Sequence, residues 1–312
     1  MSTDATSQSW EHWTLHRAIT AKNILILFVA FVLLSFSAHN TEMDKAFVET
    51  SKAVLSMAGI GESQVLDGAV RFGGKAFPLQ ISERTAVNRL EKYDPDNLPL
   101  FSRVEVAEDK EYDALTDTWT VETTEFLIEP FGYLIKVLAK MWETIEMGFW
   151  GTVISVMISL PLGILSSRNY TPHRLIYTIA RGWLSFHRAM PELIIALFLV
   201  LMYGFGPIAG VLALAIHTSG VLGKFFADEI ENAPPGPQTA LAASGANKMK
   251  VLRYAVFPHV LPAWIAYVQY IFERNIRTAT VLGIVGAGGI GMELKGRWDL
   301  FDYSHVSTIL LV

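Results

Sequence analysis

The chain of 312 residues contains no cysteine, and only 18% of its residues are charged. The missing cysteine excludes disulfide frameworks, thiol catalysis and cysteine-based zinc sites. Soluble domains carry about 25% charged residues, so this chain has few side chains with which to solubilise a surface. The formal charge of −5 disfavours a general nucleic-acid-binding protein. Because 51% of the residues are hydrophobic, the composition predicts a membrane protein.

The few charges are distributed unevenly along the chain. Residues 39–130 hold 18 acidic and nine basic side chains, whereas the remainder carries a net positive charge. A polar, acidic segment is therefore inserted into an apolar chain, which marks a domain boundary. We expect residues 1–39 to form an N-terminal segment and a first membrane helix, residues 40–130 an acidic insert, and residues 131–312 the main membrane domain.

Uncharged runs mark the predicted membrane spans, because a helix needs about 20 apolar residues to cross a hydrocarbon core. They cover residues 24–38, 147–167, 193–223, 254–272, 278–292 and 306–312. A turn signal at residues 204–207 splits the third run, so its first half needs a helix that begins near Tyr177. That helix would be kinked at Pro191 and would bring Arg188 and Glu192 to the membrane interface. The last run is too short to cross, which predicts that the sequence stops inside its final span.

Basic residues in short segments set the predicted orientation. Arg17 and Lys22 precede the first apolar run and place the N-terminus in the cytoplasm. A secretory signal peptide is the alternative for this run. With a cytoplasmic N-terminus, the acidic insert is external, and the segments 168–174 and 228–253 are internal.

The acidic insert itself gives few structural signals. Gly73 and Gly74 suggest a turn, and residues 118–121 alternate weakly between apolar and polar side chains, as in a strand. Directly after the insert, residues 131–142 have the apolar spacing of an amphipathic helix. We expect that helix at the outer membrane interface.

An internal segment, residues 237–258, is unusually rich in alanine and apolar side chains. It predicts two short helices joined at Gly245, where glycine adopts a positive φ at little cost. Their small side chains would let a partner approach the backbone closely. The alternative is an amphipathic helical hairpin that lies on the bilayer.

The spacing from Ala240 through Gly245 to Pro258 resembles the EAA loop of type I ABC importer permeases, in which proline follows glycine by thirteen positions. The motif is degenerate at its first and third positions, which are Thr239 and Leu241. Further segments resemble the phosphonate/phosphite branch of that family: RAMPE (188–192), GVLALAIHT (210–218), GVLGK (220–224), FERNIRTATVLG (272–283) and GAGGIG (286–291). The resemblance extends from about residue 145 to the end and does not cover the insert.

The resemblance implies an all-α polytopic membrane protein with a MetI-like permease fold, about six transmembrane helices and a periplasmic insert after the first. It implies a location in the bacterial inner membrane, an ATPase dimer on the cytoplasmic side and a periplasmic substrate-binding protein. A second permease chain, identical or paralogous, would complete the channel. ATP and Mg²⁺ would bind the ATPase, so this chain would hold no cofactor and catalyse no reaction. The expected ATPase-coupling residues are Thr239, Ala240, Leu241, Gly245 and Pro258.

Charged residues between two apolar runs suggest a translocation path. These are Glu273, Arg274 and Arg277. Because charge within a membrane is costly, charged residues at such places suggest a function. On a helix, Glu273 and Arg277 can pair, which leaves Arg274 on another side, where its guanidinium suits an oxyanion. The alternative is a structural ion pair at the outer membrane interface. His217, in mid-span, either lines the path or forms a hydrogen bond within the bundle.

The sequence GAGGIG contributes Gly286, Gly288, Gly289 and Gly291. It matches the dinucleotide-binding pattern GxGxxG, but the acidic residue expected about twenty positions later is missing. A break between two membrane helices, forming a gate, is the better interpretation, because irregular backbone at that depth must be buried or line a cavity. The scattered histidines predict no metal site, and the sequence has no HExxH, GxSxG or Walker A motif.

Together these patterns predict a permease that moves phosphonate, phosphite or a related phosphorus oxyanion by alternating access. Two alternatives stay open. One is an intramembrane enzyme that uses Glu192, His217 and Glu273, and the other is a receptor whose external insert binds a ligand.

Overall fold

The computed structural model describes residues 21–90, 98–99, 101–113 and 118–312. The chain divides into two compact units, residues 1–74 and 75–312, and each is described by itself. Arg17, which contributes to the predicted orientation, lies outside the described residues.

The described part of the first unit, residues 21–74, contains three helices. They are α1 (Ala21–Asn40), α2 (Met43–Met57) and most of α3 (Gln64–Ala76). The helix predicted over residues 24–38 is confirmed by α1, whose apolar side chains, such as Phe31 and Leu34, are exposed. The turn predicted at Gly73 and Gly74 is wrong, because α3 continues through both residues. Glycine permits a turn but does not impose one.

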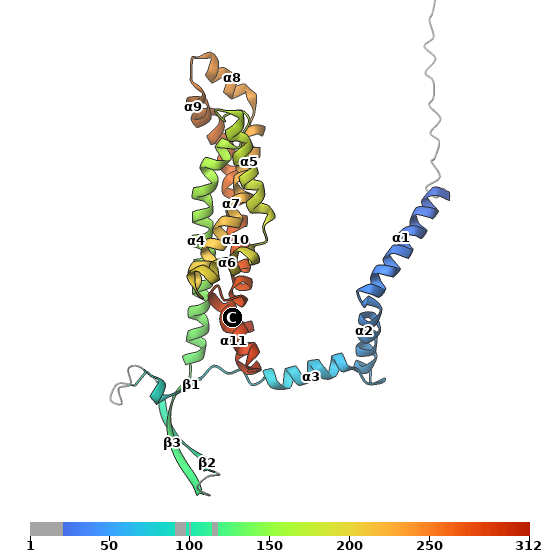
Figure 1. Ribbon diagram of the computed structural model, residues 1–312, viewed down its shortest axis with the longest axis vertical. Helices are drawn as coiled ribbons and strands as arrows, with labels where there is room; N and C mark the ends of the chain where they lie inside the picture. Colours follow the sequence, from blue (N-terminus) through green and yellow to red (C-terminus); the bar gives the residue numbers. More distant parts are fainter. Residues whose placement is uncertain (1–20, 91–97, 100, 114–117) are drawn as a thin grey trace, which may run out of the picture. The chain divides into compact units, whose positions relative to one another are not determined.

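The second unit is a helical bundle with a small sheet (Figure 1). Its helices are α4 (Gly132–Leu165), α5 (Arg174–Ala189), α6 (Glu192–Tyr203), α7 (Pro207–Asn232), α8 (Pro235–Ala243), α9 (Lys248–Val251), a π-helical turn η2 (Leu252–Val256), α10 (Phe257–Ile284), α11 (Gly289–Asp299) and α12 (Tyr303–Leu311). Helices α4, α7 and α10 pack side by side along the bundle (Figure 1). Residues 132–311 are therefore mainly helical, as predicted.

Helix α4 is a single helix of 34 residues, about 51 Å long at 1.5 Å per residue. It covers nearly all of the predicted span at residues 147–167 and of the amphipathic segment at residues 131–142. The predicted helix over residues 131–142 is confirmed as the first part of α4, and its place at the membrane interface stays a prediction. Glu143 and Glu146, which separate the two segments in sequence, favour helix and do not interrupt it.

Small residues on α4 allow its neighbours to approach closely. A methyl group added at Gly148 would meet Ile276 of α10, and one added at Gly151 would meet Leu214 of α7. Such contacts are typical of helix packing in membranes, where dispersion contacts between closely spaced backbones replace the hydrophobic effect. Towards the far end of α7, Phe226 stacks on Trp264 of α10 with ring centroids 4.4 Å apart.

The helix predicted to run from near Tyr177 to Tyr203 is broken into α5 and α6. The two helices meet at an angle of 89° at Met190 and Pro191. Proline has no amide hydrogen to continue the helix and restricts the residue before it to extended conformations. The turn predicted at residues 204–207 is confirmed, with Gly204 and Gly206 at φ values of 85° and 146° between α6 and α7.

The sheet lies beside the first turns of α4. Strands β1 (Glu83–Ala86), β2 (Arg103–Asp113) and β3 (Thr118–Glu129) pair antiparallel in the order β1-β3-β2, and η1 (Val87–Arg89) follows β1. The strand signal at residues 118–121 marks the start of β3. Lys136 Nζ on α4 lies 3.3 Å from Glu83 Oε1 on β1. Helices α8 and α9 are at the opposite end of the bundle from the sheet (Figure 1).

Among the described residues, three helical segments are long and apolar enough to cross a membrane: Gly132–Leu165, Pro207–Asn232 and Lys248–Asp299. The count rises to five if each of two bent helix pairs forms one span. The predicted total of about six spans and the predicted cytoplasmic N-terminus stay predictions.

Candidate translocation and coupling sites

The centre of the bundle holds a cluster of three polar side chains, Glu192, His217 and Arg274, from α6, α7 and α10. Arg274 Nη2 lies 3.4 Å from Glu192 Oε1 and 3.0 Å from His217 Nε2. His217 Nε2 lies 3.3 Å from Glu192 Oε2. The exposed side-chain fractions are 10% for His217, 27% for Glu192 and 30% for Arg274. An acid and a base are thus held together, largely out of solvent, beside a buried imidazole.

Backbone structure positions this cluster. Glu192 is the first residue of α6, directly after the bend at Pro191. His217 Nδ1 lies 3.0 Å from the carbonyl oxygen of Met190, so the imidazole also holds the backbone at the bend. Because a guanidinium can only donate, His217 Nε2 accepts from Arg274, and Nδ1 carries the proton that it donates to Met190. His217 therefore forms the hydrogen bond within the bundle that was one of its two predicted roles.

Glu192 contacts the middle of a long helix. Its partner His217 is near the middle of α7, a helix long enough to span a membrane. The helix predicted to kink at Pro191 is bent by 89°, so α6 takes a different direction from α5. The position of Glu192 relative to the membrane interface stays a prediction.

Glu273 and Arg277 form the predicted pair on α10, with 3.1 Å between Arg277 Nη2 and Glu273 Oε1. Both side chains are exposed, by 73% and 69%. Arg274 lies on another side of α10, as the helical spacing predicts, and joins the central cluster instead. Glu273 is therefore separated from Glu192 and His217, and the three groups that the enzyme alternative requires are not brought together.

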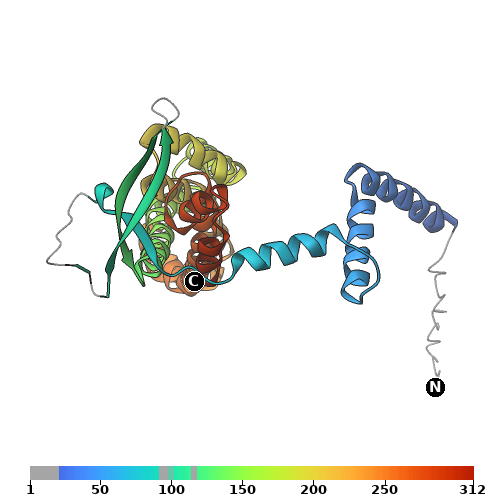
Figure 2. The same ribbon diagram turned by 90° about the horizontal axis from the view of Figure 1, so that it is seen from below.

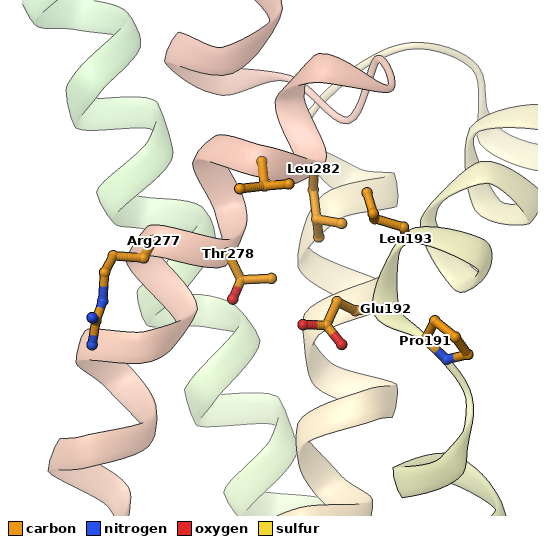
Figure 3. A pocket seen from close by; sticks show the side chains of 7 residues that line it. Pro191, Glu192, Leu193, Arg277, Thr278 and Leu282 are labelled. Atoms are coloured by element: carbon orange, nitrogen blue, oxygen red, sulfur yellow. The ribbon is translucent and has the colours of Figure 1, made fainter. Parts of the chain in front are cut away.

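A cavity of about 200 Å³ lies beside the cluster, between α6 and α10. Its lining residues are Pro191, Glu192, Leu193, Arg277, Thr278, Val281 and Leu282. Figure 3 shows the Glu192 carboxylate directed towards α10, whereas the Arg277 guanidinium extends away from Glu192. The cavity lining thus includes the Glu192 carboxylate and the Thr278 hydroxyl, together with apolar side chains of both helices.

The glycine-rich segment breaks the chain between α10 and α11, as predicted. Gly286, Gly288 and Gly289 have φ values of 94°, 87° and 68°, which L-residues rarely adopt. The Gly206 N–H donates to the Gly286 carbonyl oxygen at 3.0 Å, so the turn between α6 and α7 packs on this break. Helix α10, not a strand, precedes the segment, which removes the βαβ context that dinucleotide binding requires. The role of the break as a gate stays a prediction.

Side chains of α4 cap the first turn of α11. The Gly289 N–H donates to Glu143 Oε1 at 3.0 Å, and the Ile290 N–H donates to Thr144 Oγ1 at 2.8 Å. A carboxylate at this place also complements the positive end of the helix dipole. Sequence reasoning missed both residues, because their partners are 146 positions away and no local pattern connects them.

The segment predicted to couple to the ATPase forms the two expected short helices, α8 and α9. Gly245 joins them with a φ of 86°, and its N–H donates to the Ala242 carbonyl oxygen at 3.0 Å. Thr239 and Ala240 are exposed, Leu241 is half-buried, and no residue of α8 is fully buried. Pro258 lies in the first turn of α10, directly after the π-helical turn η2.

One hydroxyl group connects α8 to the segment between α4 and α5. The Tyr170 hydroxyl donates to Gln238 Oε1 at 2.8 Å, and Gln238 Nε2 donates to the carbonyl oxygens of Ala233 and Pro234. Burial raises the pKa of Tyr170, which keeps this hydroxyl protonated and able to donate. These hydrogen bonds of Gln238 hold α8 against the neighbouring segments and leave its other side exposed.

A bundle of long apolar helices, with a bent helix pair at its centre and an exposed two-helix segment at one end, defines a transport permease. The chain belongs to the family of binding-protein-dependent transport system inner membrane components, whose sequence model matches residues 159–311. Members are permease subunits of ABC importers, multi-pass membrane proteins that work with an ATPase and a substrate-binding protein. They are transport subunits and not enzymes.

Individual relatives agree with this assignment. HtxE of Stutzerimonas stutzeri, whose name assigns it to a phosphite transport system, is 51% identical over 75% of this chain and 92% of its own length. The phosphite transport system permease protein PtxC of the same organism is 44% identical over 54% of this chain and 62% of its own. The phosphate-import permease protein PhnE of Mycolicibacterium smegmatis is 45% identical over 54% of this chain and 32% of its own.

Solved structures support the fold alone. A chain of the MetNI methionine ABC transporter is similar with a TM-score of 0.50 and 20% sequence identity. The similarity covers 56% of this chain and 86% of that one. The predicted MetI-like permease fold is thereby confirmed.

Proposed function

We propose that this permease carries phosphite, a phosphonate or a closely related phosphorus oxyanion, and that Arg274 binds the anion during translocation. The observation that carries the proposal is the position of Arg274, an arginine in the middle of the bundle whose partners are one carboxylate and one imidazole. The high identity to a relative named for phosphite transport supports the choice of anion.

Glu192 acts in this proposal as the resident counter-ion of Arg274. A guanidinium in partly dry surroundings is stable only when it is paired. The carboxylate supplies that pairing while no substrate is present, at a distance of 3.4 Å that is long for a charge-assisted hydrogen bond. A phosphorus oxyanion presents two oxygens to the planar fork of arginine and therefore competes well with this contact. His217 keeps Arg274 in place while its ionic partner changes.

The remaining parts of the machinery follow from the same proposal. The N-terminus and the segment 237–258 lie in the cytoplasm, and residues 40–130 lie in the periplasm. ATP and Mg²⁺ bind the ATPase subunits, which dock on the surface formed by Thr239, Ala240 and Leu241. A second permease chain, identical or paralogous, completes the path, and the break at residues 286–291 is its gate.

Uptake by the complete importer tests the proposal. The permease, its ATPase and its binding protein are reconstituted in lipid vesicles, and ATP-dependent uptake of labelled phosphite is measured against competing methylphosphonate, hypophosphite, phosphate and sulfate. We expect methylphosphonate and hypophosphite, whose phosphorus is reduced relative to that of phosphate, to compete with phosphite. Arg274→Ala should lower uptake by about tenfold or more, since hydrogen bonds to charged groups contribute about 1.5–3 kcal/mol. Arg277→Ala is measured alongside, as the exposed arginine of the same helix.

A paired variant separates substrate binding from a structural role. Arg274→Ala leaves Glu192 without its ionic partner, which alone costs stability. Glu192→Gln/Arg274→Gln removes both charges and keeps hydrogen-bonding side chains, so it should restore the amount of inserted protein but not uptake. Normal transport by the double variant would show that Arg274 does not bind substrate. Normal transport by both Arg274→Ala and Arg277→Ala would show the same.

A further inference from the structure

Helix α5 carries arginines at intervals of seven residues: Arg174, Arg181 and Arg188. Seven residues make nearly two helical turns, so the three side chains share one face of the helix and are about 10 Å apart along it. Thr178 and Ser185 lie between them on that face. We call these five residues the arginine face of α5.

Apart from the arginine face, α5 has one exposed apolar side and one side that is buried against α7. One side is exposed and apolar, with Leu175, Ile179, Trp183 and Phe186 all more than half exposed. The opposite side is buried against α7, where the Leu184 side chain packs closely on Gly223. The helix thus separates an apolar surface, suited to lipid, from a polar one.

The arginine face extends from the central cluster to the end of the bundle that holds α8. At one end, the backbone nitrogen of Arg188 packs on Gly220 of α7, one turn from His217. At mid-length, Arg181 Nη2 lies 2.6 Å from Asp228 Oδ1 and 3.8 Å from Glu231 Oε2. Fourteen residues separate Arg174 from Arg188, so the face covers about 21 Å.

A pocket marks the end of this face. It has a volume of about 550 Å³ and is lined by Arg168, Thr171, Pro172, His173, Arg174 and Tyr177. Two guanidinium groups and an imidazole therefore surround a cavity at the end of the bundle where α8 begins. Arg168 Nε donates to the Tyr177 hydroxyl at 3.2 Å, which holds one of these guanidinium groups at the pocket wall.

Two of the three arginines form no ion pair within the parts of the chain that the structure describes. These are Arg174 and Arg188, and both are exposed. A polar, charged face on a membrane-embedded helix has to meet water, a partner or a ligand of opposite charge. A row of such charges raises the local concentration of small anions.

We infer that the arginine face of α5 and the pocket at its end form the cytoplasmic half of the translocation path, along which the phosphorus oxyanion moves from Arg274 past Arg188 and Arg181 to Arg174. The inference rests on the proposed function, since only an anionic cargo would use these charges. Arg181 is partly neutralised by Asp228, which makes the middle position a weak site that the anion leaves readily.

A negative charge added to this face tests the inference. Ser185, exposed between Arg181 and Arg188, is replaced in the reconstituted importer by Asp and, as the matched neutral control, by Asn. We expect Ser185→Asp to lower phosphite uptake by about tenfold through repulsion of the anion, whereas Ser185→Asn changes it less than about twofold. Arg188→Gln should also lower uptake, and Arg188→Lys, which keeps the charge, should restore most of it.

Additional measurements distinguish the two proposals. Arg71→Gln, an exposed change outside the bundle, controls for loss of one positive charge from the whole chain. Equal uptake by Ser185→Asp and Ser185→Asn, with wild-type uptake of phosphite intact, would overturn the anion path and leave the proposed function standing. A wild-type importer that hydrolyses ATP in response to its binding protein but accumulates no phosphorus oxyanion would overturn both.

Discussion

Polar side chains inside the bundle connect one helix to another. Asn275 Nδ2 donates to Thr152 Oγ1 of α4 at 2.9 Å, and Asn275 Oδ1 accepts from Thr218 Oγ1 of α7 at 3.1 Å. Ser159 Oγ donates to the Ser219 carbonyl oxygen at 3.1 Å in the same way. Asn275 follows Arg274 directly, so the network that orients α10 also fixes the helix face on which the arginine lies. At the residue scale, the polar groups of this protein determine which helix faces meet.

The Asn275 network can be tested by truncation. Asn275→Ala should lower the free energy of unfolding in detergent by about 1 kcal/mol, the usual size of a hydrogen bond between membrane helices, because Thr218 loses its acceptor. Gln269→Ala, an exposed amide on the same helix, is the control and should change the free energy by less than about 0.5 kcal/mol. Equal effects of the two substitutions would show that the buried network contributes nothing.

Among the helices, the junction between α10 and α11 depends on close backbone contacts. A methyl group at Gly283 would lie 2.5 Å from the Gly288 carbonyl oxygen, and one at Gly291 would collide with the Thr280 carbonyl oxygen. The break therefore folds back against the last turns of α10 with glycine on both sides of the contact. The backbones can approach this closely because Gly283 and Gly291 have no side chains.

Two alanine substitutions in α11 separate this contact from ordinary helix propensity. Gly291→Ala should destabilise the protein by about 1–3 kcal/mol, the usual cost of overpacking, because backbone and not a flexible side chain opposes the methyl group. Gly296→Ala, in the same helix with no atom within 4 Å of the added methyl, should instead stabilise it by about 0.4–1 kcal/mol. Thermal unfolding of the purified permease measures both. Stabilisation by Gly291→Ala would contradict the close contact.

At the scale of the whole molecule, the proposed coupling segment and the central cluster are joined by continuous helices. Helix α7 leads from His217 to the residues before α8, and α10 leads from Pro258 to Arg274. A displacement of α8 and α9 by an ATPase is therefore transmitted along two packed helices to the Glu192–Arg274 contact. The 89° bend between α5 and α6 places α6 across that route.

The connection at Gly245 gives a test of coupling. Gly245→Val forces a β-branched side chain into a φ of 86°, a conformation that only glycine adopts readily, so the angle between α8 and α9 must change. We expect the variant to insert into the membrane normally and to lose most of the ATP hydrolysis that the binding protein stimulates. Gly236→Val, in the first turn of α8 with ordinary φ and open space around it, is the control and should retain stimulation. Equal loss in both variants would contradict a requirement for positive φ.

The sequence predicted much of the bundle, because long uncharged runs, a glycine–proline turn and a glycine-rich break are local signals. It predicted the pairing of Glu273 with Arg277 and the separate direction of Arg274 from helical spacing alone. It missed the contact of Glu192 with Arg274, and the caps that Glu143 and Thr144 provide, because the partners are distant in sequence. It also divided α4 at two glutamates that the helix accommodates.

What the sequence determined by itself is therefore the class of protein: long apolar runs predict membrane helices, and the motifs from residue 188 to residue 291, taken together, resemble those of ABC importer permeases. Only the tertiary structure decided which charges meet. The bend at Pro191 turns α6 across the bundle and places Glu192 beside His217 and Arg274 at its centre. A bend of 89° and a kink of a few degrees have the same sequence signature, since proline removes one hydrogen bond in either case, and packing against α7 and α10 selects between them.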